Sequence, residues 1–135
     1  MTRIAIDADV ALRLVREGVR IRPEQHLVGP AVLRSHALQE LYRAVRAGEL
    51  ADAEGRRLLE GLAGLKIRLL GDRVSRAVAW RIAAQLDRDD TALAEYLAVA
   101  QLQSDLLVTA DPALAAAAEG IVAVGTWDDH FGPRG

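Results

Sequence analysis

Two acidic residues near opposite ends of the chain each follow a short apolar run, a placement that suits a metal or acid–base site. Asp7 follows Ile4-Ala5-Ile6, and Asp111 closes a stretch that begins with Leu106-Leu107-Val108. A helix-forming stretch comes after each acid, so both acids are predicted to lie at strand-to-helix junctions. In open α/β sheets, ligands bind at the carboxyl ends of the strands. Each carboxylate there can cap its helix or hold a hard cation.

Capping and cation binding both remain open for this pair. Parallel strands would bring Asp7 and Asp111 to the same edge of one sheet, where carboxylates repel each other unless a cation or a proton lies between them. Capping is equally compatible with the sequence, because Pro112 directly follows Asp111 and proline is favoured at the first helical position.

The elements that must position these acids follow from the hydrophobic pattern. Apolar runs predict parallel strands near residues 3–7, 66–70, 105–109 and 121–124, with 66–70 towards an edge and weaker strand character at 25–28. Helical patterns lie between them, at residues 10–16, 29–48, 51–62, 72–86, 92–102 and from 112. The helix at 92–102 is apolar almost all round and should be buried, with Glu95 paired to an arginine. The tail at 127–130 is expected at the surface. This alternation predicts one α/β domain over residues 1–135, with a central parallel sheet of four to five strands flanked by helices.

Composition narrows the class of protein. The chain has no cysteine, which excludes disulfides and thiolate metal sites. It carries no signal-peptide pattern, and no apolar run approaches the roughly 20 residues needed to span a membrane, so a cytoplasmic protein is expected. A net charge of −2 argues against a nucleic-acid binder that relies on bulk positive charge. This net charge is compatible with a nuclease whose acidic residues bind a metal ion that contacts the phosphate.

Four segments, in order and over nearly the whole chain, resemble the PIN-domain family of small metal-dependent nucleases, which includes the VapC-type toxins. The segments are residues 4–10, 29–35, 94–100 and 107–111. The resemblance implies an endoribonuclease that depends on Mg²⁺ or Mn²⁺ and acts on RNA. It also implies a small antitoxin that silences the enzyme, and a homodimer formed through helical faces.

The family supplies its metal-binding acids from four places, and the second is changed in this chain. Asp7 and Asp111 match the first and last acids. His36 stands where the family has a glutamate, and a histidine is a poor ligand for hard Mg²⁺. Glu40, one turn further along the helix, replaces the missing acid if its side chain points back towards the helix start. A surface ion pair with a nearby arginine is the alternative.

The third acidic position is also changed. Leu93 stands there, and leucine offers no ligand atom. Asp89 and Asp90 lie one turn upstream, and either could supply the carboxylate. Capping of the following helix is the alternative role of Asp90. Asp9 stands where the family often has a small polar residue, and it would restore part of the lost negative charge.

The sequence therefore predicts a metal-dependent ribonuclease with a defined set of acids. The catalytic residues are Asp7 and Asp111, the metal ligands are Asp7, Asp90 and Asp111, and the auxiliary acids are Asp9, Asp89 and Glu40. The alternative is a PIN-like module that has lost catalysis at His36 and Leu93 and binds RNA or another protein. A nucleotide-binding α/β domain is disfavoured because the sequence has no glycine-rich phosphate loop.

Overall fold

Five parallel strands form the centre of the molecule, which a computed structural model describes over residues 1–133. The strands are β1 (Thr2–Ile6), β2 (Gln25–Pro30), β3 (Ile67–Leu70), β4 (Leu106–Val108) and β5 (Val124–Gly125), in the sheet order β3-β2-β1-β4-β5. Ile4, Ala5 and Ile6 of the central strand are all fully buried, as expected for a parallel sheet that is covered on both faces. The predicted single α/β domain with a parallel sheet is confirmed.

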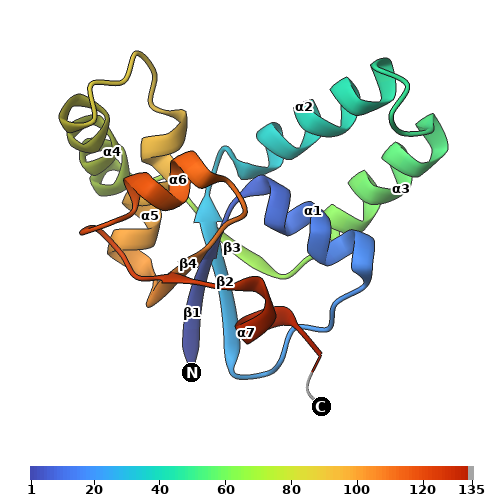
Figure 1. Cartoon of the computed structure of the whole chain (residues 1–135), viewed down its shortest axis with the longest axis horizontal. Helices are drawn as coiled ribbons and strands as arrows, with labels where there is room; N and C mark the ends of the chain where they lie inside the picture. Colours follow the sequence, from blue (N-terminus) through green and yellow to red (C-terminus); the bar gives the residue numbers. More distant parts are fainter. Residues whose placement is uncertain (134–135) are drawn as a thin grey trace.

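Seven helices surround this sheet in the described part of the chain. They are α1 (Ala8–Glu17), α2 (Leu33–Arg46), α3 (Asp52–Ala63), α4 (Arg73–Gln85), α5 (Ala92–Gln103), α6 (Pro112–Ala117) and α7 (Trp127–Phe131). Figure 1 shows α1 to α3 to one side of the sheet and α4 to α6 to the other. None of the helices in this range is long and apolar enough to cross a membrane. The predicted burial of α5 is confirmed, since Ala94, Leu97 and Ala98 are fully buried.

Two strand boundaries differ from the prediction. Gly29 and Pro30, predicted to open a helix, instead end β2, where they pair with Leu69 and Leu70 of β3. Proline favours an extended residue before it, and the α2 helix begins only at Leu33. Strand β5 is shorter than predicted and begins later. The N–H groups of Ile121 and Val122 bond to the carbonyl of Ala118 in a turn. Strand β3 lies at a sheet edge, as predicted.

The predicted surface tail is wrong in part, because residues Trp127–Phe131 form α7 and pack on the core. Phe131 is buried, and its ring lies 5.2 Å from the ring of Trp127. The guanidinium of Arg13 on α1 lies 3.9 Å from the centre of the Trp127 ring. Trp127 and Phe131 are one helical turn apart, so a helix places both aromatic rings on one face.

Gly18 ends α1 in the left-handed conformation, at φ 61°. The N–H of Gly18 donates to the carbonyl of Val15, and the N–H of Val19 donates to the carbonyl of Leu14, so these last carbonyls of the helix are satisfied. We expect Gly18→Ala to lower the free energy of unfolding by about 1 kcal/mol, because a side chain disfavours this φ even where space is free. Gly64→Ala is the matched control, since Gly64 ends α3 at φ −86°. Urea denaturation that gives equal losses for both variants would contradict this explanation.

Candidate functional site

Asp7 lies between β1 and α1 and is buried, with only 7% of its surface exposed. Its Oδ1 accepts the N–H of Val10 at 2.9 Å, so the capping role is real. Its Oδ2 accepts the hydroxyl of Thr109, which lies just beyond β4. Thr109 therefore fixes the orientation of the Asp7 carboxylate across two neighbouring strands. Sequence reasoning missed this threonine, whose only signal was its place at the end of an apolar run.

Asp111 lies at the same edge of the sheet as Asp7, as predicted, because β1 and β4 are adjacent parallel strands. Its Oδ1 accepts the N–H of Ala113 at 2.9 Å and caps α6. Its own N–H donates to the Thr109 hydroxyl oxygen at 3.0 Å. Both acids therefore cap their helices, and both lie at the same edge of the sheet.

The acids at this edge share one pocket of about 350 Å³ with side chains from α2, α5 and α6. The acids that line the pocket are Asp7, Asp9, Glu40, Asp90 and Asp111. Arg43 and Arg88 line it as well and supply positive charge. Most of the predicted site residues are therefore brought together.

Glu40 on α2 is half-buried and turned towards the acids, with no ion pair to an arginine among the described residues. Burial raises the pKa of Glu40 to about 8, together with a hydrogen bond that it shares with Asp9 and with the charges of Asp9 and Asp7. Of the two alternatives for Glu40, the surface ion pair is not found within residues 1–133, and the side chain lies with Asp9 in the acidic pocket. Glu40 thus keeps a proton near neutral pH.

The pKa of Asp7 is also raised, mainly by burial. The hydrogen bonds from Thr109 and Val10 lower it, while the charges of Asp9 and Asp111 raise it further. Raised pKa values on two neighbouring acids mean that the pocket holds more negative charge than its surroundings stabilise. A proton or a bound cation relieves that repulsion.

His36 and Tyr96 fill the side of the pocket where the second family acid was expected. The Nδ1 atom of His36 lies 2.9 Å from the Tyr96 hydroxyl, and the two rings are 5.7 Å apart. The pKa of Tyr96 is raised by burial and by the charges of Asp7 and Glu40, so its phenol stays protonated. Sequence reasoning gave Tyr96 no role in the site, because only the fold brings α5 against α2.

The remaining predicted acids differ in their placement. Asp90 lines the pocket and its Oδ1 accepts the N–H of Ala92 at 3.1 Å, so it also caps the start of α5. Asp89 is exposed and is not among the residues that line the pocket, because α5 begins only at Ala92. Glu95 was predicted to pair with an arginine. It accepts instead a 3.4 Å hydrogen bond from Thr91.

Carboxylate oxygens are the ligands that Mg²⁺ and Mn²⁺ prefer, so the lining of the pocket fits such an ion in its chemistry. Within residues 1–133, however, no group of three or more acidic, histidine or cysteine side chains is arranged to hold a metal ion. The capping bonds of Asp7 and Asp111 draw these carboxylates towards their own helices. Leu93, which lines the same pocket, adds no oxygen.

Comparisons with known proteins bear on the fold alone. No protein-family model matches the chain, and no curated protein is significantly similar to it. The crystal structure of PAE2754 from Pyrobaculum aerophilum is similar, with a TM-score of 0.70 and 21% sequence identity over 91% of this chain and 90% of that chain. The similarity covers nearly the whole chain, and at 21% identity it supports the fold of this protein and nothing further.

Proposed function

We propose that this protein is a metal-dependent endoribonuclease of the PIN family, acting in the cytoplasm as the toxin of a toxin–antitoxin pair. The observation that supports the proposal best is the shared pocket of Asp7, Asp9, Glu40 and Asp111 at the carboxyl edge of a parallel sheet. Two of these acids have raised pKa values, mainly because burial disfavours their ionised forms, and a bound cation would stabilise those forms. The order of the PIN-like segments in the sequence adds to this support.

In the proposed site, Asp7 and Asp111 would hold Mg²⁺ or Mn²⁺, helped by Asp90 and by Glu40 after it loses its proton. When bound, such an ion would supply an activated water and stabilise the negative charge of the phosphodiester during hydrolysis. Thr109 orients the Asp7 carboxylate through its hydroxyl. Burial raises the pKa of Glu40 most, and the hydrogen bond that Asp9 shares with Glu40 raises it further.

The side chains around these acids bind the RNA. Arg43 and Arg88 line the pocket and contact the phosphates on either side of the cleaved bond, as guanidinium groups bind phosphate well. Tyr96 keeps its phenol proton and its bond to His36 at neutral pH, which closes that side of the pocket. In this proposal the two arginines position the RNA strand, and the acidic residues act at the bond that is cleaved.

Two protein partners belong to the proposal: a small antitoxin that covers the acidic pocket, and a second copy of this chain. Leu38 and Tyr42 are exposed one turn apart on α2 and offer an apolar surface for the second copy. Light scattering at micromolar concentration should therefore give the mass of a dimer, and Tyr42→Arg should give a monomer. A wild-type monomer without any partner present would contradict the dimer.

The proposed activity is tested by incubating the purified protein with varied single-stranded RNAs and Mn²⁺. Cleavage should require the ion and stop in EDTA. Asp90→Asn should reduce cleavage if Asp90 is a ligand, since asparagine keeps the cap at α5 but removes the charge. The exposed Asp89, which lies outside the pocket lining, gives the matched control, Asp89→Asn. Loss of equal size in both variants would contradict a ligand role for Asp90.

A second candidate function is an RNA-binding or protein-interaction module without catalysis. It is favoured by the lack, in residues 1–133, of a group of three side chains arranged for a metal, and by Leu93 at the third family position. RNA binding without cleavage or metal binding in the wild type would support it.

A further inference from the structure

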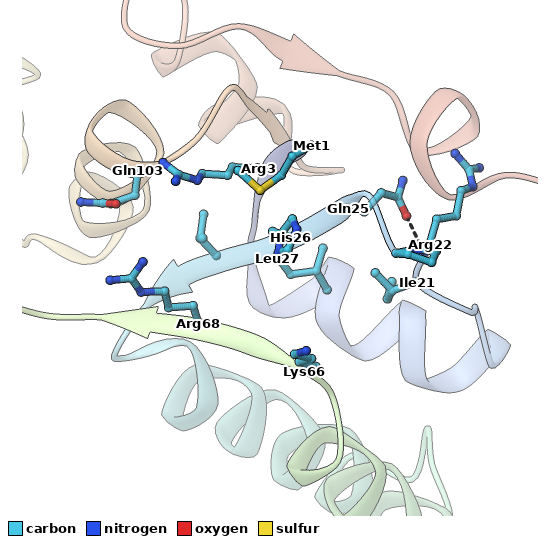
Figure 2. Close-up of a pocket in the computed structure, with 12 residues that line it drawn as sticks. Met1, Arg3, Ile21, Arg22, Gln25, His26, Leu27, Lys66, Arg68 and Gln103 are labelled. Atoms are coloured by element: carbon cyan, nitrogen blue, oxygen red, sulfur yellow. Dashed lines mark hydrogen bonds between the residues drawn. The ribbon is translucent and has the colours of Figure 1, made fainter.

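A second pocket, of about 440 Å³, lies on the face of the sheet over the amino-terminal half of β1, β2 and β3 (Figure 2). Its lining is rich in basic side chains, and no acidic residue is among the residues that line it. The basic residues that matter for the argument are Arg3, His26, Lys66 and Arg68. We call them the cationic groove.

The sheet register explains why these four side chains gather. Arg3 of β1 pairs with His26 of β2, and Arg68 of β3 pairs with Val28 of β2. Residues two apart in a strand share one face, so Arg3, His26 and Arg68 lie on the same face of the sheet. Lys66, directly before β3, lines the same pocket. The four residues are exposed, while Val28 on the floor of the groove is buried.

The positive charges of the groove are not neutralised within the described part of the chain. No ion pair there involves Arg3, Lys66 or Arg68, and only the backbone N–H of Arg3 donates to Asp105. Like charges on neighbouring strands destabilise a sheet. Basic residues on an edge strand also protect it from aggregation, which accounts for Lys66 and Arg68. Protection of an edge strand does not explain Arg3, because β1 is the central strand of the sheet.

The arrangement of the arginines suits an anion that spans the groove. In Figure 2 the side chains of Arg3 and Arg68 come from different strands and both extend towards Gln103 at the end of α5. Guanidinium groups are donors only, and their forks match phosphate oxygens in pairs, while the amide of Gln103 can also donate. The apolar floor of the groove, Val28, is buried and offers little area to a protein partner.

We propose that the cationic groove binds the phosphate backbone of single-stranded RNA. The proposal rests on RNA being the ligand of this protein, and it extends the proposed substrate site to a second position. Arg3 precedes Asp7 by four residues on β1, about 13 Å along the strand, and the residues between them, Ile4 to Ile6, are fully buried. A single RNA strand that contacts both the groove and the acidic pocket therefore passes around the sheet and spans more than this distance. Backbone contacts of this kind hold the strand and carry no sequence information.

The test measures RNA binding by fluorescence anisotropy with a labelled single-stranded oligonucleotide, in EDTA and with Asp7→Asn present in every variant. The double variant Arg3→Gln/Arg68→Gln should bind at least about tenfold more weakly, and its affinity should depend less on salt, because two phosphate contacts are lost. Arg56→Gln/Arg57→Gln is the matched control, because it removes the same charge from the exposed face of α3. It should bind RNA like the parent protein, which carries Asp7→Asn alone.

Each outcome decides the matter. Unchanged RNA binding in the double variant, with its folding verified by thermal denaturation, would overturn the proposal, as would an equal loss in the Arg56/Arg57 control. Inorganic diphosphate tests whether the groove binds free phosphates and not the phosphate backbone of RNA. If diphosphate raises the melting temperature of the parent but not of the double variant, while RNA binding is equal in both, the groove serves free phosphates and the proposal fails. Because this test measures RNA binding and not cleavage, failure of the groove proposal can be distinguished from failure of the nuclease proposal.

Discussion

Asp7→Asn is expected to lower Mn²⁺-dependent RNA cleavage by about 100-fold or more while leaving the protein at least as stable as the wild type. A ligand that stabilises charge through the metal contributes several kcal/mol to the transition state, which corresponds to a loss of this size. Stability should persist because asparagine keeps the Oδ1 acceptor for the Val10 N–H and caps as well as aspartate. Removing a buried charge beside Asp9 and Asp111 also relieves repulsion in the metal-free protein.

The measurement pairs single-turnover cleavage with thermal denaturation of the same preparation. Asp111→Asn should behave like Asp7→Asn, since it keeps the cap at α6. Asp105→Asn, directly before β4 and outside the lining of the pocket, should leave cleavage unchanged. Cleavage that survives both Asp7→Asn and EDTA would mean that another site, or a contaminating nuclease, is responsible.

The second large effect concerns Glu40 and pH. In the folded protein the pKa of Glu40 is raised to about 8, against 4.5 as its ordinary value. Between these two values the folded state holds a proton that the unfolded state has lost. The free energy of unfolding of the metal-free protein should therefore fall as pH rises through this window, by up to about 1.4 kcal/mol per pH unit for one proton.

Glu40→Gln should remove most of this pH dependence and leave the protein more stable than the wild type at pH 8. Glutamine keeps a donor for Asp9 and carries no charge that must be buried. Urea denaturation from pH 5 to pH 8.5 measures the effect. Glu60→Gln, at an exposed position of α3, is the matched control and should track the wild type. A wild-type protein whose stability is flat across this range would contradict the raised pKa of Glu40.

The fold was predictable to a large extent because its signals are local. Apolar runs identified β1, β3 and β4, and the apolar helix at residues 92–102 identified the buried α5. Parallel pairing then brought Asp7 and Asp111 to one edge, which needs no knowledge of side-chain contacts. The boundaries of β2 and β5 were misplaced, because pairing with neighbouring strands decided them.

The parts of the site that escaped prediction depend on contacts between distant segments. The bond from Thr109 to Asp7 joins residues 102 positions apart, and the His36–Tyr96 contact joins residues 60 apart. The direction of Glu40 was left open from the sequence, since both alternatives fit the same helix. Similarly, the cationic groove exists only because the register aligns Arg3 with His26. Local patterns carry no information on such pairings.

Calorimetric titration with Mn²⁺ shows whether the pocket of Asp7, Glu40 and Asp111 binds a divalent metal. At pH 7 Glu40 is largely protonated, so we expect saturable binding that releases about one proton per ion, seen as a dependence of the heat on the buffer. Asp7→Asn should abolish this binding, and the wild type should also gain thermal stability with Mn²⁺. A wild-type protein that shows no saturable Mn²⁺ binding, or an Asp7→Asn variant that binds Mn²⁺ equally well, would contradict a metal site in this pocket.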